Sequence, residues 1–291
     1  MRIAIYGKRF DETFGSYVQT LIDLIVERNV SLTVEKGFFE FMRDAIPDCP
    51  TLPTFAHSSD LKEVDFVISI GGDGTLLDTV TLVRDSEIPV LGINTGRLGF
   101  LSLVDVDSIA KAVDSLIDGK FAIDKRSLIH AESTNNTFGE FPFALNELTL
   151  LNKERNSMIA VQTMVNGIYM NTYWADGLIV ATPTGSTAYS LSCGGPIIMP
   201  DSGNFIVTPI APHNLNARPF VLSDQNTISL KPDGRDSQFL VHLDSRAYSI
   251  EKNDIVHISL APFRFHLVNL HDQNFFTTIR NKLGWGLDIR N

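Results

Sequence analysis

Two hydrophobic periodicities alternate along the first 120 residues of the chain, and this alternation limits the possible folds more than any other feature. Short apolar runs at 2–6, 64–70 and 88–93 are typical of strands, and the run at 64–70 is typical of a strand buried on both faces. Apolar residues recur at helical spacing within 18–25, 38–45, 76–83 and 109–117. Strands that alternate with helices in this way predict a parallel sheet with helices on both faces, over residues 1–121.

After Phe121 the helical periodicity largely disappears, and short β-rich runs continue to Val268. Asn166-Gly167 lies between two of these runs and has the composition of a two-residue hairpin turn. The pattern predicts an antiparallel sandwich or a related multi-sheet domain over residues 122–268. The tail, 269–291, is predicted to pack back on either domain, with a helix from Asn274 as one option.

The overall charge and composition exclude several classes of function. The net charge is −10 and no basic stripe counters it, which disfavours a long nucleic-acid partner. Backbone N–H groups and a divalent cation can still neutralise the phosphates of a small nucleotide. No run of 18 apolar residues predicts a membrane span, and the N-terminal apolar run is too short for a signal peptide. Cys49 and Cys193 fit no disulfide framework or zinc pattern, so we expect a cytoplasmic protein.

A glycine-rich pentad, Gly71-Gly72-Asp73-Gly74-Thr75, follows the buried strand and precedes a helix. Its N–H groups, at a helix N-terminus, would form an anion site suited to phosphates. A carboxylate beside a phosphate is repulsive unless it accepts a proton from an attacking hydroxyl or faces a metal, so Asp73 is a candidate base. The alternative is a plain turn in which Asp73 caps the helix. The pentad lacks the Gly-Lys-Ser/Thr of a Walker A motif.

Two further segments carry candidate binding groups. A glycine-bearing loop at 94–100 follows the next strand, where ligand loops of open α/β sheets gather, and its Arg97 is either a phosphate contact or a surface charge. Asn146-Glu147 lies inside the β-rich run at 144–151. Consecutive residues of a strand point to opposite faces, so one of this pair is expected to point inward or into a site. Its amide and carboxylate could hold a ribose or an adenine edge.

Six hydroxyl side chains fall within nine residues, from Thr184 to Ser192, after a strand and a Pro/Gly turn. Serine and threonine at a turn usually serve as local caps, which is the simpler interpretation. Six hydroxyls exceed what caps require, and they would suit a site that binds ribose hydroxyls and phosphate oxygens.

Taken in this order, the segments resemble the NAD kinase family, also called ATP-NAD kinases. The pentad alone also suits diacylglycerol and sphingosine kinases, whereas the stretch Thr-Pro-Thr-Gly-Ser-Thr-Ala-Tyr-Ser at 182–190 is far more specific. The other matching segments are 96–101, Asn146-Glu147, Asp176-Gly177 and 194–196, with weaker similarity at 217–219, Asp244-Ser245 and 282–285. The resemblance therefore spans nearly the whole chain.

The resemblance implies a Rossmann-like α/β domain followed by a β-sandwich-like domain. It implies a homodimer or homotetramer that transfers the γ-phosphoryl group of ATP to the 2′-hydroxyl of the adenosine ribose of NAD, with a divalent cation, Mg²⁺ being expected. Asp73 would be the general base, Gly71, Gly72 and Gly74 would line the triphosphate, and Asn146 and Glu147 would hold the nicotinamide-side ribose region. The remaining substrate-binding residues expected on this basis are Thr75, Asp176, Thr184, Thr187, Ala188, Tyr189, Ser190, Leu191, Ser192 and Arg246.

The chain departs from bacterial relatives at three positions. Ala175 stands where a basic residue often precedes the aspartate, Ser157 stands where a histidine is common, and Arg246 stands where many relatives carry glutamine. These changes leave the proposed base and the phosphate loop intact. They bear on how the dinucleotide is held and on the choice between NAD and NADH.

Three other functions are weaker. A lipid kinase of the diacylglycerol type would need an apolar entrance or a membrane-seeking face, and the sequence has no basic amphipathic helix. A non-catalytic dinucleotide sensor would keep the hydroxyl-rich segment but could lose Asp73. An NAD-dependent oxidoreductase would carry Gly-x-Gly-x-x-Gly after the first strand, and residues 7–10 do not supply it.

Overall fold

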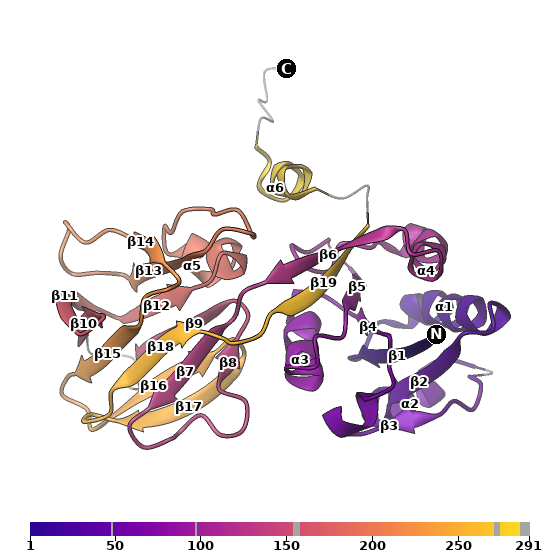
Figure 1. The fold of residues 1–291 in the computed structure, drawn as a ribbon, viewed down its shortest axis with the longest axis horizontal. Coiled ribbons are helices and arrows are strands. Elements are labelled where there is room, and N and C mark those ends of the chain that lie inside the picture. The colour runs from indigo at the N-terminus through magenta and orange to yellow at the C-terminus, as the bar shows by residue number, and fades with distance from the viewer. Residues whose placement is uncertain (48, 97, 154–157, 271–273, 286–291) are drawn as a thin grey trace. The chain divides into compact units, whose positions relative to one another are not determined.

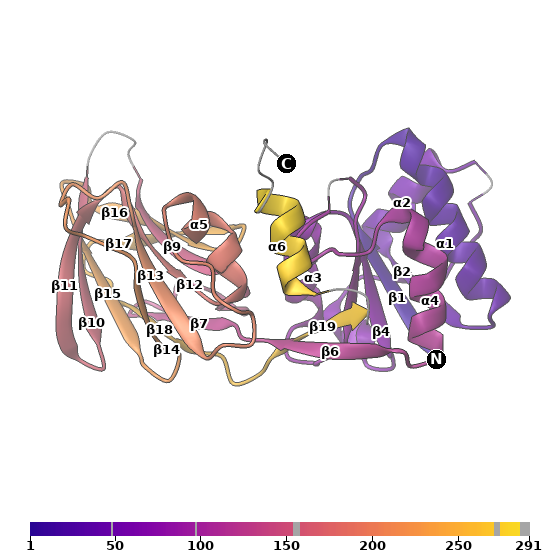
Figure 2. The ribbon, with the colours of Figure 1, turned by 90° about the horizontal axis from the view of Figure 1, so that it is seen from above.

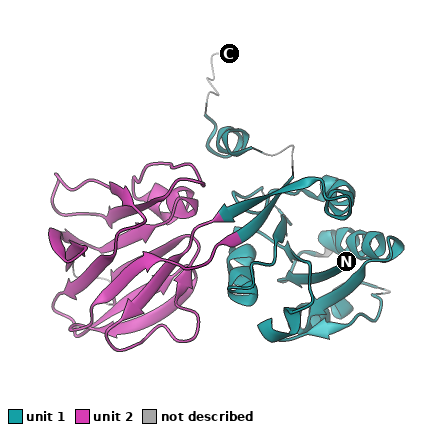
Figure 3. Ribbon diagram, viewed as in Figure 1, with its two compact units in different colours: residues 1–125, 266–291 teal, residues 126–265 magenta. Residues whose placement is uncertain are grey.

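The computed structural model describes all residues except 48, 97, 154–157, 271–273 and 286–291. The chain forms two compact units, residues 1–125 with 266–291 and residues 126–265 (Figure 3). The chain therefore enters the second unit once, at 125–126, and leaves it once, at 265–266.

Unit 1 is built on a seven-stranded sheet of order β3-β2-β1-β4-β5-β19-β6 (Figure 1). Its strands are β1 (Arg2–Gly7), β2 (Ser31–Glu35), β3 (Thr54–Phe55), β4 (Phe66–Ile70), β5 (Val90–Ile93), β6 (Phe121–Arg126) and β19 (Phe265–Leu270). Every pair in this sheet whose register is described is parallel, which confirms the predicted parallel sheet. From β1 the chain first adds strands on one side and then, with β4, on the other. Ligand loops of open α/β sheets gather at such a reversal point.

Two strands of this sheet come from sequence that we expected in the β-rich domain. β6 and β19 lie at the two passages between the units, and Leu267 of β19 is opposite Val90 of β5. The sequence offered no contrary signal, because a short strand can have the same composition in either kind of sheet.

The helices of unit 1 are α1 (Gly15–Glu27), α2 (Lys36–Ala45), α3 (Asp73–Val83), α4 (Ile109–Ile117) and α6 (Phe275–Leu283), the last in the region where the tail was predicted to be helical. Local capping defines their ends. The Glu35 carboxylate accepts the Phe38 N–H at 2.7 Å at the start of α2, and the Asn274 side chain accepts the Thr277 N–H at 2.9 Å at the start of α6. Figure 2 shows where α2 and α6 lie in the fold. Gly284 ends α6 in the left-handed conformation that favours glycine.

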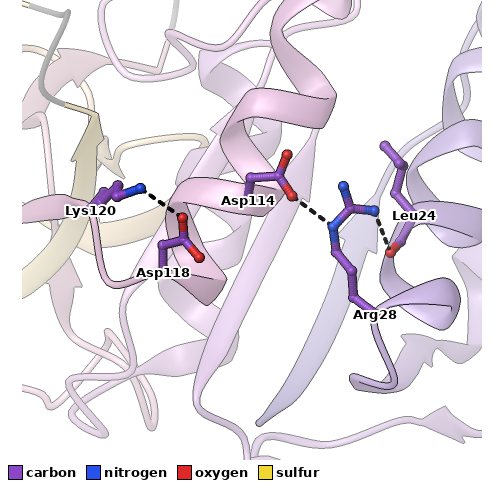
Figure 4. Close-up of polar contacts among 5 residues, drawn as sticks. All are labelled: Leu24, Arg28, Asp114, Asp118 and Lys120. Atoms are coloured by element: carbon purple, nitrogen blue, oxygen red, sulfur yellow. Dashed lines mark hydrogen bonds and ion pairs between the residues drawn. The ribbon is translucent and has the colours of Figure 1, made fainter.

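Helices α1 and α4 pack on the sheet through fully buried apolar residues such as Ile22 and Leu116. Polar contacts at their ends add to this packing (Figure 4). Arg28, which ends α1, donates to the Asp114 carboxylate of α4 at 2.7 Å and to the Leu24 carbonyl at 3.1 Å. Because both charged side chains remain partly exposed, the apolar contacts carry most of the attachment.

Unit 2 consists of two six-stranded antiparallel sheets, of order β11-β10-β15-β18-β7-β8 and β14-β13-β12-β9-β16-β17. Buried residues of both sheets, such as Val161 and Val180, share one apolar core, which confirms the predicted sandwich. Asn166 and Gly167 form the predicted turn, with φ of 50° and 77°. The strands are β7 (Ile129–Ser133), β8 (Phe143–Ala144), β9 (Glu147–Asn152), β10 (Ile159–Val165), β11 (Ile168–Ala175), β12 (Gly177–Ala181), β13 (Asn204–Ile210), β14 (Phe220–Ser223), β15 (Ile228–Asp233), β16 (Gln238–Leu243), β17 (Arg246–Glu251) and β18 (Val256–Leu260).

Unit 2 contains little helix. A short 3₁₀ turn (Thr184–Thr187) and the single-turn helix α5 (Tyr189–Ser192) follow β12. Across the described part of the chain, none of the helices has both the length and the apolar character needed to cross a membrane.

Candidate active site

The glycine pentad forms the turn between β4 and α3. Gly71 has φ of 146°, and a Cβ there would collide with the Thr75 side chain, so the turn requires glycine. Gly72 and Gly74 are exposed, and a Cβ at either position would meet no atom within 4 Å. The fold itself therefore gives no steric reason for these two glycines. What they provide is an open backbone at the N-terminus of α3, where N–H groups and the helix dipole favour an anion.

Asp73 is the first residue of α3, and its carboxylate binds the loop that follows β5. Oδ2 accepts the Phe100 N–H at 2.8 Å, and Oδ1 accepts the N–H groups of Leu101 at 3.1 Å and Ser102 at 3.0 Å. Gly99 permits this approach, because a Cβ there would collide with the carboxylate. Asp73 therefore does not cap its own helix. A carboxylate has about four lone-pair positions, so Oδ2 can still accept a further hydrogen bond.

The rest of this loop is held by Asn94, which is almost fully buried after β5. Its Oδ1 accepts the Gly96 N–H at 2.6 Å, and its amide donates to the Ser102 carbonyl at 3.4 Å. The Lys282 ammonium of α6 lies 5.9 Å from the centre of the Phe100 ring. Arg97, whose role we left open, lies outside the described residues. The two glycine-bearing loops of unit 1 are thus tied to each other through Asp73.

Asn146 and Glu147 do not lie inside one strand, as the sequence suggested. Strand β8 ends at Ala144 in one sheet and β9 begins at Glu147 in the other, so Leu145 and Asn146 form the crossing between the two sheets. The alternating pattern of a strand is therefore interrupted at this point. The crossing leaves backbone N–H and C=O groups outside the strand ladders, and these need other partners.

One set of partners comes from the segment after β12. The Thr182 hydroxyl donates to the Leu145 carbonyl at 2.6 Å, and the Thr182 N–H donates to the Asn146 carbonyl at 2.9 Å. Gly185 packs so closely that a Cβ there would collide with the Asn146 carbonyl. The crossing and the start of the hydroxyl-rich segment thus form one packed unit.

Most hydroxyls of that segment are used within the fold. The Thr184 hydroxyl accepts from Arg126 at 3.3 Å, and the Thr187 hydroxyl donates to the Thr184 carbonyl at 3.3 Å. The Ser186 hydroxyl binds the main chain of Ile198, and the Ser190 hydroxyl binds the Thr208 hydroxyl at 2.9 Å. Four of the six hydroxyls therefore shape the turn, as the simpler interpretation held.

The remaining residues predicted in this region lie nearer the surface. Tyr189 is 41% exposed, and Ser192 and Asp176 are also exposed. Ala188 and Leu191 are half-buried. These side chains are more accessible to a ligand than the four hydroxyls that shape the turn.

Glu147 is a buried acid with a strongly raised pKa. Its Oε2 is buried and has no hydrogen-bond partner among the described residues. Burial, and then the negative charge of Asp244, raise the pKa of Glu147 to about 8. Burial also raises the pKa of Tyr189 and of Cys193, and the charge of Glu147 adds to both shifts. Near neutral pH the Glu147 side chain is therefore largely a neutral acid that can donate as well as accept a hydrogen bond.

The sequence did not predict the structural roles of Asp244, Arg126 and Thr182. For Asp244, the weak similarity to the family around Asp244-Ser245 was one of the few available signals. Arg246, predicted to bind substrate, donates to the carbonyls of Phe141 and Phe143, just before the crossing. Its guanidinium also lies 5.1 Å from the centre of the Phe141 ring. In this structure Arg246 therefore supports the segment that leads to Asn146.

Comparisons with known proteins decide the family. The model of the ATP-NAD kinase N-terminal domain matches residues 4–121, and that of the ATP-NAD kinase C-terminal domain matches residues 145–270. The NAD kinase of Cytophaga hutchinsonii is 43% identical over 292 residues, covering 100% of both chains. The chain belongs to the NAD kinase family. The NAD kinase of Porphyromonas gingivalis is also similar, with 41% identity over 290 residues and 99% of both chains covered.

Two solved structures are similar to the chain over most of its length. An NAD kinase from Archaeoglobus fulgidus in complex with ATP has a TM-score of 0.75 and 25% identity, with 96% of this chain and 99% of that chain covered. Yeast NADH kinase complexed with NADH has a TM-score of 0.89 at 23% identity, with 100% of this chain and 89% of that chain covered. The second likeness establishes the fold. As a kinase of this family, the chain is a phosphotransferase with an alcohol group as acceptor.

Proposed function

We propose that this member of the NAD kinase family transfers the γ-phosphoryl group of ATP to the 2′-hydroxyl of the adenosine ribose of NAD, giving NADP and ADP. The observation that carries the proposal is the pentad, in which an open glycine backbone and a carboxylate stand together at the start of α3. Phosphoryl transfer needs positioning and charge stabilisation more than covalent chemistry from the protein.

Each part of the pentad has a role in this reaction. The backbone at Gly72 and Gly74 binds triphosphate oxygens, and the N-terminus of α3 favours their negative charge. Asp73 Oδ2 accepts the proton of the attacking 2′-hydroxyl. The bond from the ribose oxygen to the γ-phosphorus forms as the bond from that phosphorus to ADP breaks.

NAD is bound, on this proposal, by the segments that meet at the sheet crossing of unit 2. Asn146 and Glu147 hold the ribose region, and Arg246 supports the same segment. Support comes from two relatives, whose structures are described as complexes with ATP and with NADH. The other proposed contacts are Asp176, Thr184 and the residues from Thr187 to Ser192.

A divalent cation, Mg²⁺, is proposed to enter with ATP. Among the described residues no three His, Cys, Asp or Glu side chains come together as a metal cluster. A hard cation prefers oxygen ligands and keeps several waters, so the phosphate oxygens of ATP fit it well. When bound, it neutralises charge on the phosphates, which matters for a protein of net charge −10.

We also propose that the protein forms a homodimer or homotetramer in the cytoplasm. Sedimentation of the purified protein tests the assembly.

The test is an assay with purified protein, ATP, Mg²⁺ and NAD, in which an NADP-specific dehydrogenase detects the product. NAD that lacks the 2′-hydroxyl of the adenosine ribose is the matched control and should give no phosphorylated product. EDTA should abolish the reaction, and added Mg²⁺ should restore it. Folded protein that binds NAD but makes no NADP would favour the sensor, and absence of NAD binding would favour the lipid kinase.

A further inference from the structure

The turn between β16 and β17 contains a carboxylate that faces into the fold. Leu243 and Arg246 pair across the hairpin, so Asp244 and Ser245 form a two-residue turn. Asp244 has φ of 52°, a conformation that aspartate tolerates better than most residues. Ser245 is exposed, as expected at a hairpin tip, whereas Asp244 is partly buried. The inward direction of the Asp244 side chain therefore needs an explanation.

The explanation lies in the sheet crossing. Asp244 Oδ2 accepts the Leu145 N–H at 2.8 Å, and Oδ1 accepts the N–H groups of Asn146 at 2.8 Å and Glu147 at 3.2 Å. The Asp244 N–H in turn donates to the Glu147 carbonyl at 3.0 Å. Three consecutive N–H groups at the crossing thus converge on one carboxylate, and hydrogen bonds to a charged acceptor are the stronger kind.

The crossing is therefore held from two directions. Thr182 binds the carbonyls of Leu145 and Asn146, and Asp244 binds the N–H groups of the same residues. With donors and acceptors both fixed, the backbone of Asn146 and Glu147 has one defined conformation. The directions of their side chains follow from it.

Asp244 also acts on Glu147 through its charge. Burial raises the pKa of Asp244, while its three N–H donors and the Arg246 guanidinium oppose that shift. Because these donors stabilise a charged Asp244, the proton of the pair belongs on Glu147, whose pKa is about 8. The other titratable groups near Glu147 are Tyr189 and Cys193.

We propose that Asp244 is a positioning residue of the NAD site, whose carboxylate fixes the backbone of Asn146 and Glu147 through three hydrogen bonds. This inference rests on the proposed function, in which Asn146 and Glu147 bind NAD. Asp244 itself is not a catalytic residue on this proposal, since its oxygens are directed at the protein backbone.

The test compares Asp244→Asn with Asp254→Asn. Asp254 is a matched control, because it is a buried aspartate of the same unit that accepts the Glu251 N–H at 2.9 Å and makes no contact with the crossing. Asp244→Asn should raise the KM for NAD about tenfold to a hundredfold, as expected for lost hydrogen bonds to a charged group, and change kcat and the KM for ATP little. Asp254→Asn should leave the KM for NAD within about twofold of wild type, which is below the loss of one such bond.

A pH profile separates positioning from general damage. In the wild type the KM for NAD should rise as the pH passes about 8, where Glu147 loses its proton. In Asp244→Asn this rise should move to lower pH, because the negative neighbour is gone. Equal KM values in the two variants, or an unmoved profile, would overturn the proposal even if the wild type makes NADP. If the wild type makes no NADP, the affinity of each variant for NAD, measured by calorimetry, gives the same comparison. A wild type that binds no NAD would overturn both proposals.

Discussion

The carboxylate of Asp73 accepts the backbone N–H of Phe100 at 2.8 Å, across 27 residues of sequence. The residue proposed as the base is thus also the anchor of the loop after β5. A substitution at Asp73 therefore has two effects, on chemistry and on the loop, which an experiment must separate.

Asp73→Asn should lower kcat by about 10² to 10⁴, the usual contribution of a general base. Steady-state kinetics with ATP and NAD measure this loss. Asn94→Ala is the control, because it removes the side-chain bonds to Gly96 and Ser102 that hold the same loop while keeping the carboxylate at position 73. The loss in kcat should be clearly smaller for Asn94→Ala. Equal losses would show that loop geometry, and not proton transfer, explains the effect.

The glycines of the pentad should respond differently to alanine. Gly71→Ala should lower the free energy of unfolding by about 1–3 kcal/mol, because φ of 146° and the Thr75 side chain both oppose a Cβ. Gly72→Ala should change it by less than about 0.5 kcal/mol, since its Cβ meets open space. Gly72→Ala should nonetheless raise the KM for ATP. Urea unfolding and kinetics on the same samples test both statements, and an unchanged KM would remove Gly72 from the phosphate site.

Glu147 should make the protein less stable as the pH rises. Its pKa is raised from 4.5 when exposed to about 8 in the fold, so the folded state binds the proton more tightly. The resulting stabilisation is fully present below pH 4.5 and is lost progressively up to about pH 8. Denaturation between pH 5 and 9 should show this decline in the wild type and a flatter curve in Glu147→Gln. Glu132→Gln, at an exposed carboxylate, is the control and should follow the wild type.

Helix α4 should depend on apolar packing more than on its ion pair. Leu116→Ala should cost about 2–5 kcal/mol, as is usual for a fully buried leucine. Arg28→Ala should cost less than about 1 kcal/mol, because the pair with Asp114 is partly exposed. Urea denaturation of the two variants gives the comparison, and a larger loss for Arg28→Ala would contradict it.

Periodicity in the sequence predicted most elements of the fold. The stripe from Val18 to Ile25 became α1, and the run at 159–165 became β10 with the same bounds. Strand β2 gave no such signal, since it has only two apolar residues, Leu32 and Val34, among five. Strand β17 was missed because most of its side chains are exposed or half-buried.

The candidate site was only partly visible in the sequence. The glycine pentad and the hydroxyl-rich segment are each one short contiguous stretch, so they can be recognised from their composition. The contact between Asp244 and Asn146 joins residues 98 positions apart, and no local pattern reports it. The sequence also did not indicate the sheet crossing. The run at 144–151, which contains Leu145 and Asn146, has the composition of one continuous strand.

The connectivity of the two units orders their folding during synthesis. Residues 126–265 are one continuous stretch, so unit 2 can complete itself as soon as it has left the ribosome. Unit 1 cannot, because β6 joins its sheet beside β19, whose residues are made some 140 positions later. The unit that carries the glycine pentad is begun first and finished last. Until then the edge of β5 lacks its neighbour and is open to pairing with other chains, so unit 1 should be the part of this protein that most needs protection from aggregation before synthesis ends.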